Sequence, residues 1–176
     1  MRIPKRVARA AFGEYEYFRI FRQSSFRKDW QPKFRCSELT TVCELSECPY
    51  PEIRNSTTYL RTDSRCFVLS DDQTLIGVCW YWFGETYKTR NFWPLRAGEA
   101  KLVQITVAES ARGQGAAEDL ISQSSDIMIR SGFSALYSRV WHSHKASIRA
   151  FEKAKWNQVA RVLQIYPGGR KIRLVL

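Results

Sequence analysis

Two closely spaced glycines, Gly113 and Gly115, stand between an apolar run and a helix-like run of the sequence. The apolar run, residues 102–107, is typical of a β-strand, and the run from Ala116 to residue 131 is typical of a helix. At such a junction successive peptide N–H groups can point at one spot, the helix N-terminus adds positive potential, and no side chain obstructs a phosphate. The spacing therefore predicts a backbone cradle that binds the phosphate groups of a ligand.

Two other phosphate-binding patterns fit this stretch less well. A P-loop would place a lysine directly after its last glycine, where this chain has Ala116. A dinucleotide-binding fold would need a βαβ order and an acidic residue about 20 positions further on, and the sequence supports both poorly. An ordinary tight turn without a ligand is the remaining alternative.

The chain has only two histidines, His142 and His144, between a predicted strand (133–141) and a predicted helix (145–156). Imidazole can take or give a proton near neutral pH, so both are candidates for proton transfer, with helix capping or packing as the alternative. Ser147 can likewise approach a bound ligand or only pack.

Residues 84–98 connect two predicted strands and are rich in aromatic and basic side chains. Aromatic rings can stack on sugars or bases, so Tyr87 and Trp93 are candidates for substrate contacts. The alternative is a flap that covers the core, because aromatic side chains dominate core burial.

Length and composition indicate one globular domain over residues 1–176, with 44% hydrophobic and 14% aromatic residues. No apolar run approaches the ~20 residues that span a bilayer, and the first residues lack the apolar segment of a secretory signal. Five cysteines without a Cys-x-x-Cys pair predict reduced structural thiols, no metal site and a cytoplasmic location.

The net charge of +11 is concentrated at both ends of the chain. Residues 1–35 and residues 145–176 each carry a net +7, whereas the middle carries −3. Basic ends suggest contact with an anionic surface or ligand, and simple solubility is the alternative.

The hydrophobic periodicity predicts helices and strands around one sheet. We expect a basic helix over residues 2–12 and a strand over 15–22, although a continuous helix through residue 21 also fits the period. Residues 24–60 are predicted to be loops with a short helix near Ser37–Leu45. The remaining elements are a hairpin (66–70 and 74–83), a strand ending at Val107, a helix (116–131), a strand (133–141), a helix (145–156) and a hairpin (159–166 and 170–176).

Two blocks of the sequence carry a family resemblance. Residues 112–117, Arg-Gly-Gln-Gly-Ala-Ala, fit the pattern Gln or Arg, two residues, Gly, one residue, then Gly or Ala, and residues 143–156 are similar to an Asn-x-x-Ser/Ala … Tyr-Glu-Lys-x-Gly-Phe helix. In these blocks the chain resembles the GCN5-related N-acetyltransferases, the GNAT superfamily. The likeness covers residues 65–176, an acyl-CoA-binding core, and leaves residues 1–60 poorly defined. It implies a single α+β (mixed α/β) domain, with a central twisted, mostly antiparallel sheet whose central strands splay and are flanked by helices.

The resemblance also implies a co-substrate, acetyl-CoA or another acyl-CoA. Its pyrophosphate would be held by the main-chain amides of Gly113, Gln114, Gly115, Ala116 and Ala117. Backbone near Ile105 and Val107 would pair with the pantetheine arm, Arg112 would add positive charge unless it is a plain surface arginine, and Ser147 would lie near the cofactor.

Several family positions differ in this chain. The frequent Asn is His144, the frequent Tyr that protonates the departing thiolate is Phe151, and the closing Gly-Phe is Lys155-Trp156. The family's glutamate base corresponds to Lys101, with Glu99 two residues earlier on the same strand face. The catalytic candidates are therefore His144 and Glu99, with a solvated carboxylate as the alternative for Glu99.

The resemblance implies an N-acyltransferase in which a primary amine attacks the acyl-CoA directly within a ternary complex. The acceptor would be a small-molecule or protein amine. Two alternatives stay open: a non-catalytic acyl-CoA-binding domain, as Phe151 suggests, and a nucleic-acid or membrane-surface binding module that uses the basic ends.

Overall fold

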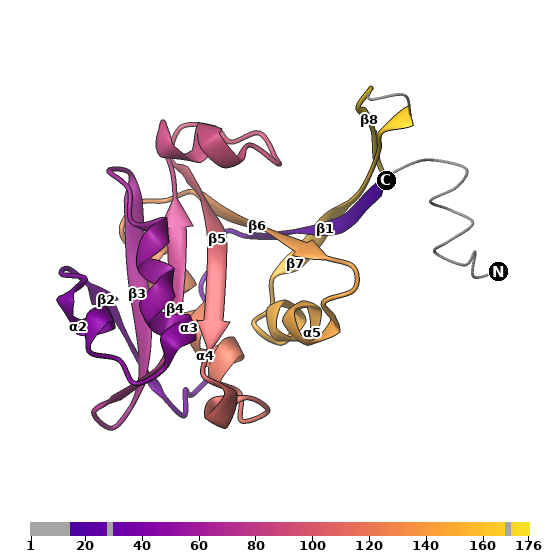
Figure 1. Cartoon of the computed structure of the whole chain (residues 1–176). Helices are drawn as coiled ribbons and strands as arrows, with labels where there is room; N and C mark the ends of the chain where they lie inside the picture. The colour runs from indigo at the N-terminus through magenta and orange to yellow at the C-terminus, as the bar shows by residue number, and fades with distance from the viewer. Residues whose placement is uncertain (1–14, 28–29, 168–169) are drawn as a thin grey trace.

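The computed structural model describes residues 15–27, 30–167 and 170–176, whose strands join in one sheet of order β2-β3-β4-β5-β6-β1-β7-β8 (Figure 1). Neighbouring strands are antiparallel except β5 and β6, which are parallel. The strands are β1 (Tyr15–Gln23), β2 (Arg35–Leu39), β3 (Ser64–Asp71), β4 (Thr74–Trp82), β5 (Glu99–Val107), β6 (Ala135–Trp141), β7 (Asn157–Ile165) and β8 (Ile172–Val175).

Helices cover both faces of the β3–β4 half of the sheet. Successive apolar side chains of these strands point to opposite faces, so each face has apolar surface to bury. Phe67 and Leu69 pack in the same cluster as the longest helix, whereas Cys66 and Val68 pack with the short helices on the other face. The helical segments are α2 (Cys43–Ser46), α3 (Pro51–Arg54), η1 (Asn55–Tyr59), η2 (Thr86–Arg90), η3 (Glu109–Ala111), α4 (Ala116–Arg130) and α5 (Lys145–Lys153).

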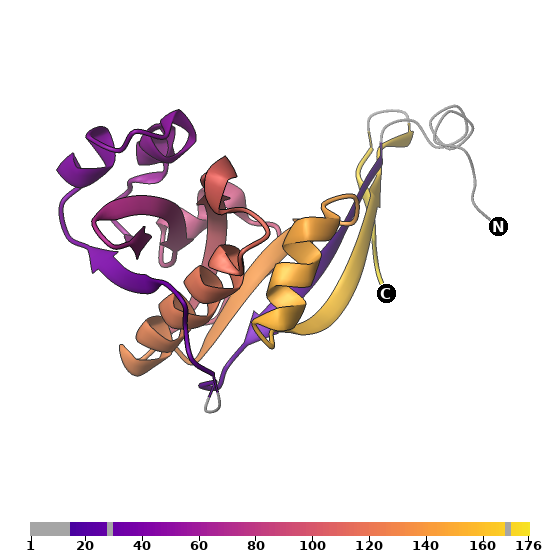
Figure 2. The same cartoon turned by 90° about the horizontal axis from the view of Figure 1, so that it is seen from below.

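Helices α4 and α5 lie side by side and share one core cluster (Figure 2). In α4, Leu120, Ile121 and Met128 are fully buried, which agrees with the helical period of the sequence. The mixed α+β fold expected from the sequence is therefore confirmed.

The first described strand, β1, lies inside the sheet between β6 and β7. Phe18 pairs with Trp141 on one side and with Val162 on the other, and its side chain is fully buried. The strand expected over residues 15–22 is confirmed, and the continuous-helix alternative is wrong because β1 pairs along both of its edges. The helix expected over residues 2–12 lies outside the described residues.

Together β1, β7 and β8 form a wing that extends away from the β2–β5 part of the sheet (Figure 1). The C-terminal hairpin expected from the sequence is confirmed as β7 and β8, which pair from Val162–Val175 to Ile165–Ile172.

Strands β5 and β6 pair only at their first residues. The parallel pairing runs from Glu99–Ala135 to Leu102–Ser138, and beyond it β5 continues to Val107 without a partner on this side. The pairing of β5 with β4 shifts register between Trp80 and Tyr81, which leaves Val103 as an extra residue in β5. The central strands therefore splay, as the resemblance implied.

Two local expectations differ from the structure. The short helix near Ser37–Leu45 is wrong for its first part, because residues 35–39 form β2 along the free edge of β3, and the helical turn begins at Cys43. Helix α5 ends at Lys153, before the expected residue 156. Lys155 has φ 61°, and the Trp156 N–H donates to the carbonyl of Phe151, which closes the helix in the manner usual for glycine.

All five cysteines are free, and Cys66 and Cys79 are buried. Burial raises the pKa of both thiols, so they remain protonated and unreactive at neutral pH. Over the described ranges, no helix is long and apolar enough to cross a membrane.

Candidate active site

The turn between β5 and α4 has the conformation that the glycine spacing predicts. Gly113 has φ 77° and Gly115 has φ 90°, values that side-chain-bearing residues rarely adopt. A Cβ atom at either position would meet no protein atom within 4 Å. The glycines are therefore required by the backbone, and the space in front of them is open.

The first turn of α4 offers unpaired amides to this space. The first hydrogen bond of the helix runs from Asp119 N–H to the Gly115 carbonyl. The N–H groups of Ala116, Ala117 and Glu118 therefore have no acceptor within the helix. Together with the helix dipole they favour an anionic group at this end.

A cavity of about 520 Å³ opens beside this turn, and three cationic side chains line it: Arg112, Arg149 and Lys153. The only acidic side chain in its lining is Glu118, which is neutralised by an ion pair of 2.8 Å with Arg27. Among the residues predicted to hold a cofactor, those that line this cradle cavity are Ile105, Val107, Arg112, Gly113, Gly115, Ala116, Ala117 and Ser147.

Gln114 is the predicted cofactor residue outside this lining. Its side-chain amide donates to the Ser110 carbonyl at 2.9 Å, and its carbonyl accepts from Lys33 Nζ at 3.1 Å. The side chain of Gln114 therefore braces the outside of the turn.

The edge of β5 that has no strand partner separates the cradle cavity from a second cavity beside it. Ala108 N–H donates to the Ile76 carbonyl on β4 at 2.8 Å. Because backbone groups alternate along a strand, Thr106 also faces β4, whereas Ile105 and Val107 direct their N–H and C=O groups into the gap beside β6. In agreement, Arg112 Nε reaches the Val107 carbonyl at 3.3 Å from the gap side.

A second cavity of about 380 Å³, here called the acceptor cavity, occupies the gap between the splayed strands. Ile105, Ser147 and Phe151 line both this cavity and the cradle cavity, so the two meet at the open edge of β5. The rest of its lining comes from Tyr59, Arg90, Phe92, Leu102, Val103, Gln104, Ser138, Arg139, Val140, Trp141 and His144.

The two histidines occupy different environments. His144 precedes α5, is exposed and lines the acceptor cavity one turn before Ser147. His142 instead has its Nδ1 3.1 Å from the Tyr17 carbonyl and its ring 5.0 Å from the Tyr17 ring. The structure thus places His144 and Ser147 in the lining of the acceptor cavity, whereas His142 is tied to β1.

Phe151 is buried, with its ring 5.4 Å from that of Phe21 and 5.0 Å from that of Trp156. It lines both cavities, at the position where the family often has a tyrosine, and it offers no proton. Any proton for a leaving group at this junction must therefore come from another side chain or from solvent.

Glu99, the second catalytic candidate, lies at the closed end of the β5–β6 pair, opposite Ala135. Its carboxylate accepts from the Arg96 N–H at 2.8 Å and from the Tyr137 hydroxyl at 3.3 Å. Neither the cradle cavity nor the acceptor cavity is lined by Glu99.

The aromatic connection is held to the sheet by Lys101, a fully buried residue of β5. Its Nζ contacts the Tyr87 hydroxyl and the Trp93 carbonyl, and the Tyr87 hydroxyl also donates to Asn91 at 2.6 Å. Burial lowers the pKa of Lys101 to about 6, and the charges of nearby Arg173 and Arg139 contribute in the same direction.

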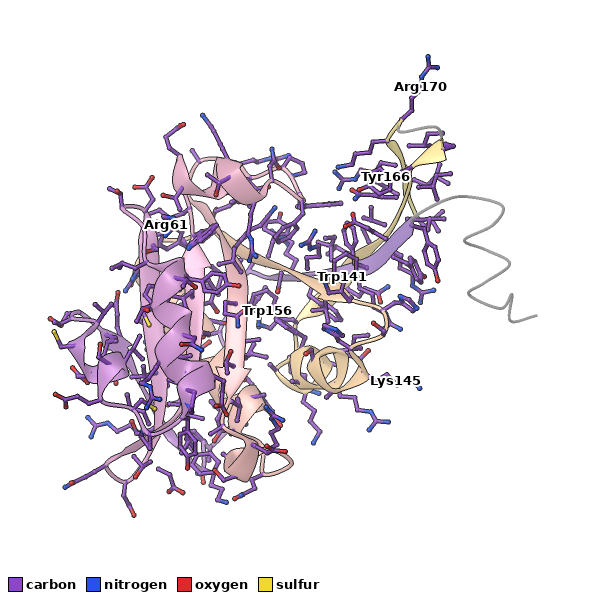
Figure 3. The ribbon with its side chains drawn as sticks, in the orientation of Figure 1. Arg61, Trp141, Lys145, Trp156, Tyr166 and Arg170 are labelled. Atoms are coloured by element: carbon purple, nitrogen blue, oxygen red, sulfur yellow. The ribbon has the colours of Figure 1, made fainter. Side chains whose placement is uncertain are left out.

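The two predicted substrate residues, Tyr87 and Trp93, therefore take part in this buried network. Two other residues of the connection, Arg90 and Phe92, reach the acceptor cavity. Both were part of the aromatic and basic connection recognised in the sequence, without being selected as substrate residues, whereas Tyr59, Arg139 and Trp141 were missed. Trp141 lies where β6 reaches the wing (Figure 3), and no local motif marks it.

Comparisons with known proteins agree with this architecture. The model of the acetyltransferase (GNAT) family matches residues 24–156. Among curated protein sequences, none is significantly similar to the chain. A GNAT acetyltransferase from Colwellia psychrerythraea superposes with a TM-score of 0.59 at 14% identity, over 88% of this chain and 57% of that one.

Two further solved structures are similar to the chain. A GCN5-related N-acetyltransferase from Sphaerobacter thermophilus gives a TM-score of 0.55 at 16% identity, over 97% of this chain and 56% of its own. A tandem GNAT protein from the clavulanic acid biosynthesis pathway gives 0.57 at 13% identity, over 91% and 57%. The chain thus spans little more than half the length of these proteins.

The glycine turn and the splayed strands both lie within the segment that the family model matches. The family match covers most of the sequence, and the chain belongs to the acetyltransferase (GNAT) family.

Proposed function

We propose that the protein is an acyl-CoA-dependent N-acyltransferase that transfers an acyl group directly to a primary amine. Acetyl is the first acyl group to test. The observation that carries the proposal is the meeting of two cavities at the open edge of β5, where Ile105, Ser147 and Phe151 line both. A donor along the cradle cavity and an amine in the acceptor cavity would bring their reacting atoms together at this junction.

The residues present fit the diphosphate and the pantetheine arm of an acyl-CoA. The unpaired amides at the start of α4, with Arg112, Arg149 and Lys153, suit two adjacent phosphates. The inward backbone groups of Ile105 and Val107 suit the amide groups of the arm. When bound, the acyl-CoA would supply the thioester carbonyl that an amine can attack.

Transfer requires that the attacking amine lose a proton, that negative charge on the carbonyl oxygen be stabilised, and that a thiolate leave. We assign proton removal to His144, which faces the acceptor side of the junction. The N–H of Ile105, directed into the gap, is suited to stabilise the carbonyl oxygen. The Ser147 hydroxyl, which borders both cavities, is suited to donate a hydrogen bond to the departing sulfur.

We prefer His144 to Glu99 as the base. Both oxygens of Glu99 already accept hydrogen bonds, from Arg96 and Tyr137, at the closed end of the strand pair. In this assignment Glu99 positions the aromatic connection and acts only indirectly on the reaction.

The test is turnover of acetyl-CoA with a panel of primary amines. The free thiol of released CoA is measured with a colorimetric reagent, and the N-acetyl product is measured by mass spectrometry. The proposal predicts matched amounts of free CoA and N-acetylated amine. Tight binding of CoA, measured by calorimetry, without turnover on any amine would instead favour a non-catalytic acyl-CoA-binding domain. Absence of CoA binding would contradict the proposal altogether.

A further inference from the structure

Positive charge is concentrated on the acceptor side of the junction. Arg90 and Arg139 line the acceptor cavity, and both also line a neighbouring cavity of about 200 Å³ that contains Lys171. Phe92 borders both spaces as well, so they adjoin around these two guanidinium groups. A ligand in the acceptor cavity would lie against two arginines.

These arginines have no carboxylate partner among the described residues. The four ion pairs of the described chain all involve other side chains. Glu16 is the only acidic residue in the lining of the smaller cavity, and its carboxylate already accepts from Gln164 and from the Tyr166 hydroxyl. The positive charge therefore exceeds the negative charge at this site.

The guanidinium of Arg139 is held in place by aromatic rings. It lies 4.9 Å from the ring centre of Phe92, 5.0 Å from that of Trp141 and 5.3 Å from that of Phe18. Stacking fixes the plane of a guanidinium and leaves its N–H donors at the rim for a planar or tetrahedral anion. Arg139 is thus oriented in advance, without a protein acceptor for its donors among the described residues.

Arg90 is placed at the beginning of the gap. Its Nη1 lies 3.5 Å from the Val103 carbonyl, on the residue where β5 begins to diverge from β6. A third guanidinium, that of Arg173, donates to the Phe92 carbonyl at 2.9 Å, and its buried Nε has no partner in the described structure. Three guanidinium groups without a carboxylate partner among the described residues, those of Arg90, Arg139 and Arg173, thus lie around Phe92.

The electrostatic environment agrees with this geometry. Burial lowers the pKa of Arg139, the Glu16 carboxylate opposes that effect, and the charge of Arg90 adds to it. A bound anion would offset both the burial and the mutual repulsion of the arginines.

We propose that the amine acceptor is a small molecule that also carries a carboxylate or phosphate group, and that Arg90 and Arg139 bind this anionic group. The inference rests on the proposed N-acyl transfer. Arg90 contacts Val103, and the junction lies two residues further along β5 at Ile105, a separation on the order of 7 Å in a strand. The amine and the anionic group of the acceptor are therefore separated by only a few bonds.

The first experiment compares matched acceptors with acetyl-CoA: 4-aminobutanoate against its amide, and 2-aminoethyl phosphate against ethanolamine. The anionic member of a pair is expected to have a kcat/KM at least about tenfold higher, because hydrogen bonds between a guanidinium and an anion are charge-assisted. The pair with the larger ratio identifies carboxylate or phosphate as the natural group. Equal rates within both pairs would overturn the inference.

Arg139→Gln is expected to lower this ratio at least about tenfold, mainly through KM of the anionic acceptor. Arg139→Lys, which keeps the charge and loses the planar fork, should retain an intermediate ratio. Arg161→Gln, an exposed arginine on β7, is the matched control and should leave the ratio as in the wild type. An unchanged ratio in folded Arg139→Gln would also overturn the inference.

A binding experiment separates this inference from the proposed function. If no amine is acetylated, the proposed function fails, and titration of 4-aminobutanoate or 2-aminoethyl phosphate into the CoA-saturated protein decides the anion site. Binding that Arg139→Gln abolishes supports the site, and absence of binding rejects it. Binding of a short oligonucleotide, with no binding of either small anion, would likewise reject the anion site, in favour of a nucleic-acid surface.

Discussion

The cradle cavity and the acceptor cavity meet at Ile105 but are built by different means. The cradle cavity is centred on consecutive residues between β5 and α4, with α5 along its other side, and its main binding groups are backbone amides set by two glycines with positive φ. The acceptor cavity is assembled from η1, η2, β5, β6 and α5, and its polar groups are side chains such as Arg90, Arg139 and His144. The cradle should therefore be sensitive to backbone conformation, and the acceptor side to the identity of single side chains.

The largest effect is expected from Gly115→Val in the cradle. A β-branched residue cannot easily adopt φ 90°, and its side chain would enter the open space in front of α4. We expect CoA affinity, measured by calorimetry, to fall about 100-fold, which corresponds to the loss of one or two charge-assisted hydrogen bonds.

Gly132→Val is the matched control for this variant. Gly132 has φ 100° and an open surrounding, but it follows the opposite end of α4. Both variants should lose comparable stability, and only Gly115→Val should lose CoA binding. Retained affinity in Gly115→Val would refute the backbone cradle.

On the acceptor side, His144→Ala is expected to lower kcat by about 100-fold, the usual contribution of a general base. The KM for acetyl-CoA should change by no more than about twofold, because His144 does not line the cradle cavity. His142→Ala is the control: it loses the contact with Tyr17 and should affect stability rather than kcat. An unchanged kcat in His144→Ala would remove this residue from the mechanism.

Lys101, which holds the aromatic connection, is expected to control the pH dependence of stability. Its folded pKa of about 6 lies below the ordinary lysine value, so between pH 6 and about 10 the unfolded chain binds more protons. Stability therefore rises with pH across this window, by at most about 1.4 kcal/mol per pH unit from this group. Below pH 6 the full cost of burying the charged ammonium applies.

The variant Lys101→Met should lack this contribution, so its free energy of unfolding, measured in urea at several pH values, should rise less steeply than that of the wild type. Lys88→Met provides the control, because Lys88 lies on the same connection and pairs only with Glu85 at the surface. Parallel pH profiles for wild type and Lys101→Met would show that Lys101 is charged in the folded protein.

The smallest effect is expected from Arg112→Gln. Arg112 is exposed and supplements the backbone amides, so its loss should raise the KM for acetyl-CoA only about threefold to tenfold, and less at high salt. Arg130→Gln, at the other end of α4, is the control and should leave this KM unchanged. An effect as large as that of Gly115→Val would mean that side-chain charge, rather than the backbone, dominates the cradle.

The same difference explains which parts of the site could be predicted from the sequence. The turn is encoded by neighbouring residues whose spacing carries its own physical meaning, so the positive φ values of Gly113 and Gly115 and the start of α4 agree with the expectation. Arg90 and Arg139 are 49 positions apart in the sequence and come together only through the fold. No local pattern distinguishes either of them from a surface arginine.

The fold was predictable where periodicity was strong and contacts were local. The β3–β4 hairpin, α4, α5 and the C-terminal hairpin all follow their expected order. The region before residue 60 was less clear, because β2 depends on pairing with β3, and the η1 residue Tyr59 acquires its role only by lying against the acceptor cavity. Sequence alone gave no reason to place β1 inside the sheet.

The interior position of β1 has a consequence for how the protein is made. Both of its neighbours, β6 and β7, are synthesised more than a hundred residues after it. During synthesis β1 therefore has neither of its strand partners until most of the chain has left the ribosome. Pairings of such long sequence separation form slowly and leave strand edges exposed to aggregation. Since Phe18 lies against Arg139, the acceptor cavity is completed only when this late pairing closes. The glycine turn and the first turn of α4 need no such pairing, because their residues are neighbours in the sequence and are synthesised before β6.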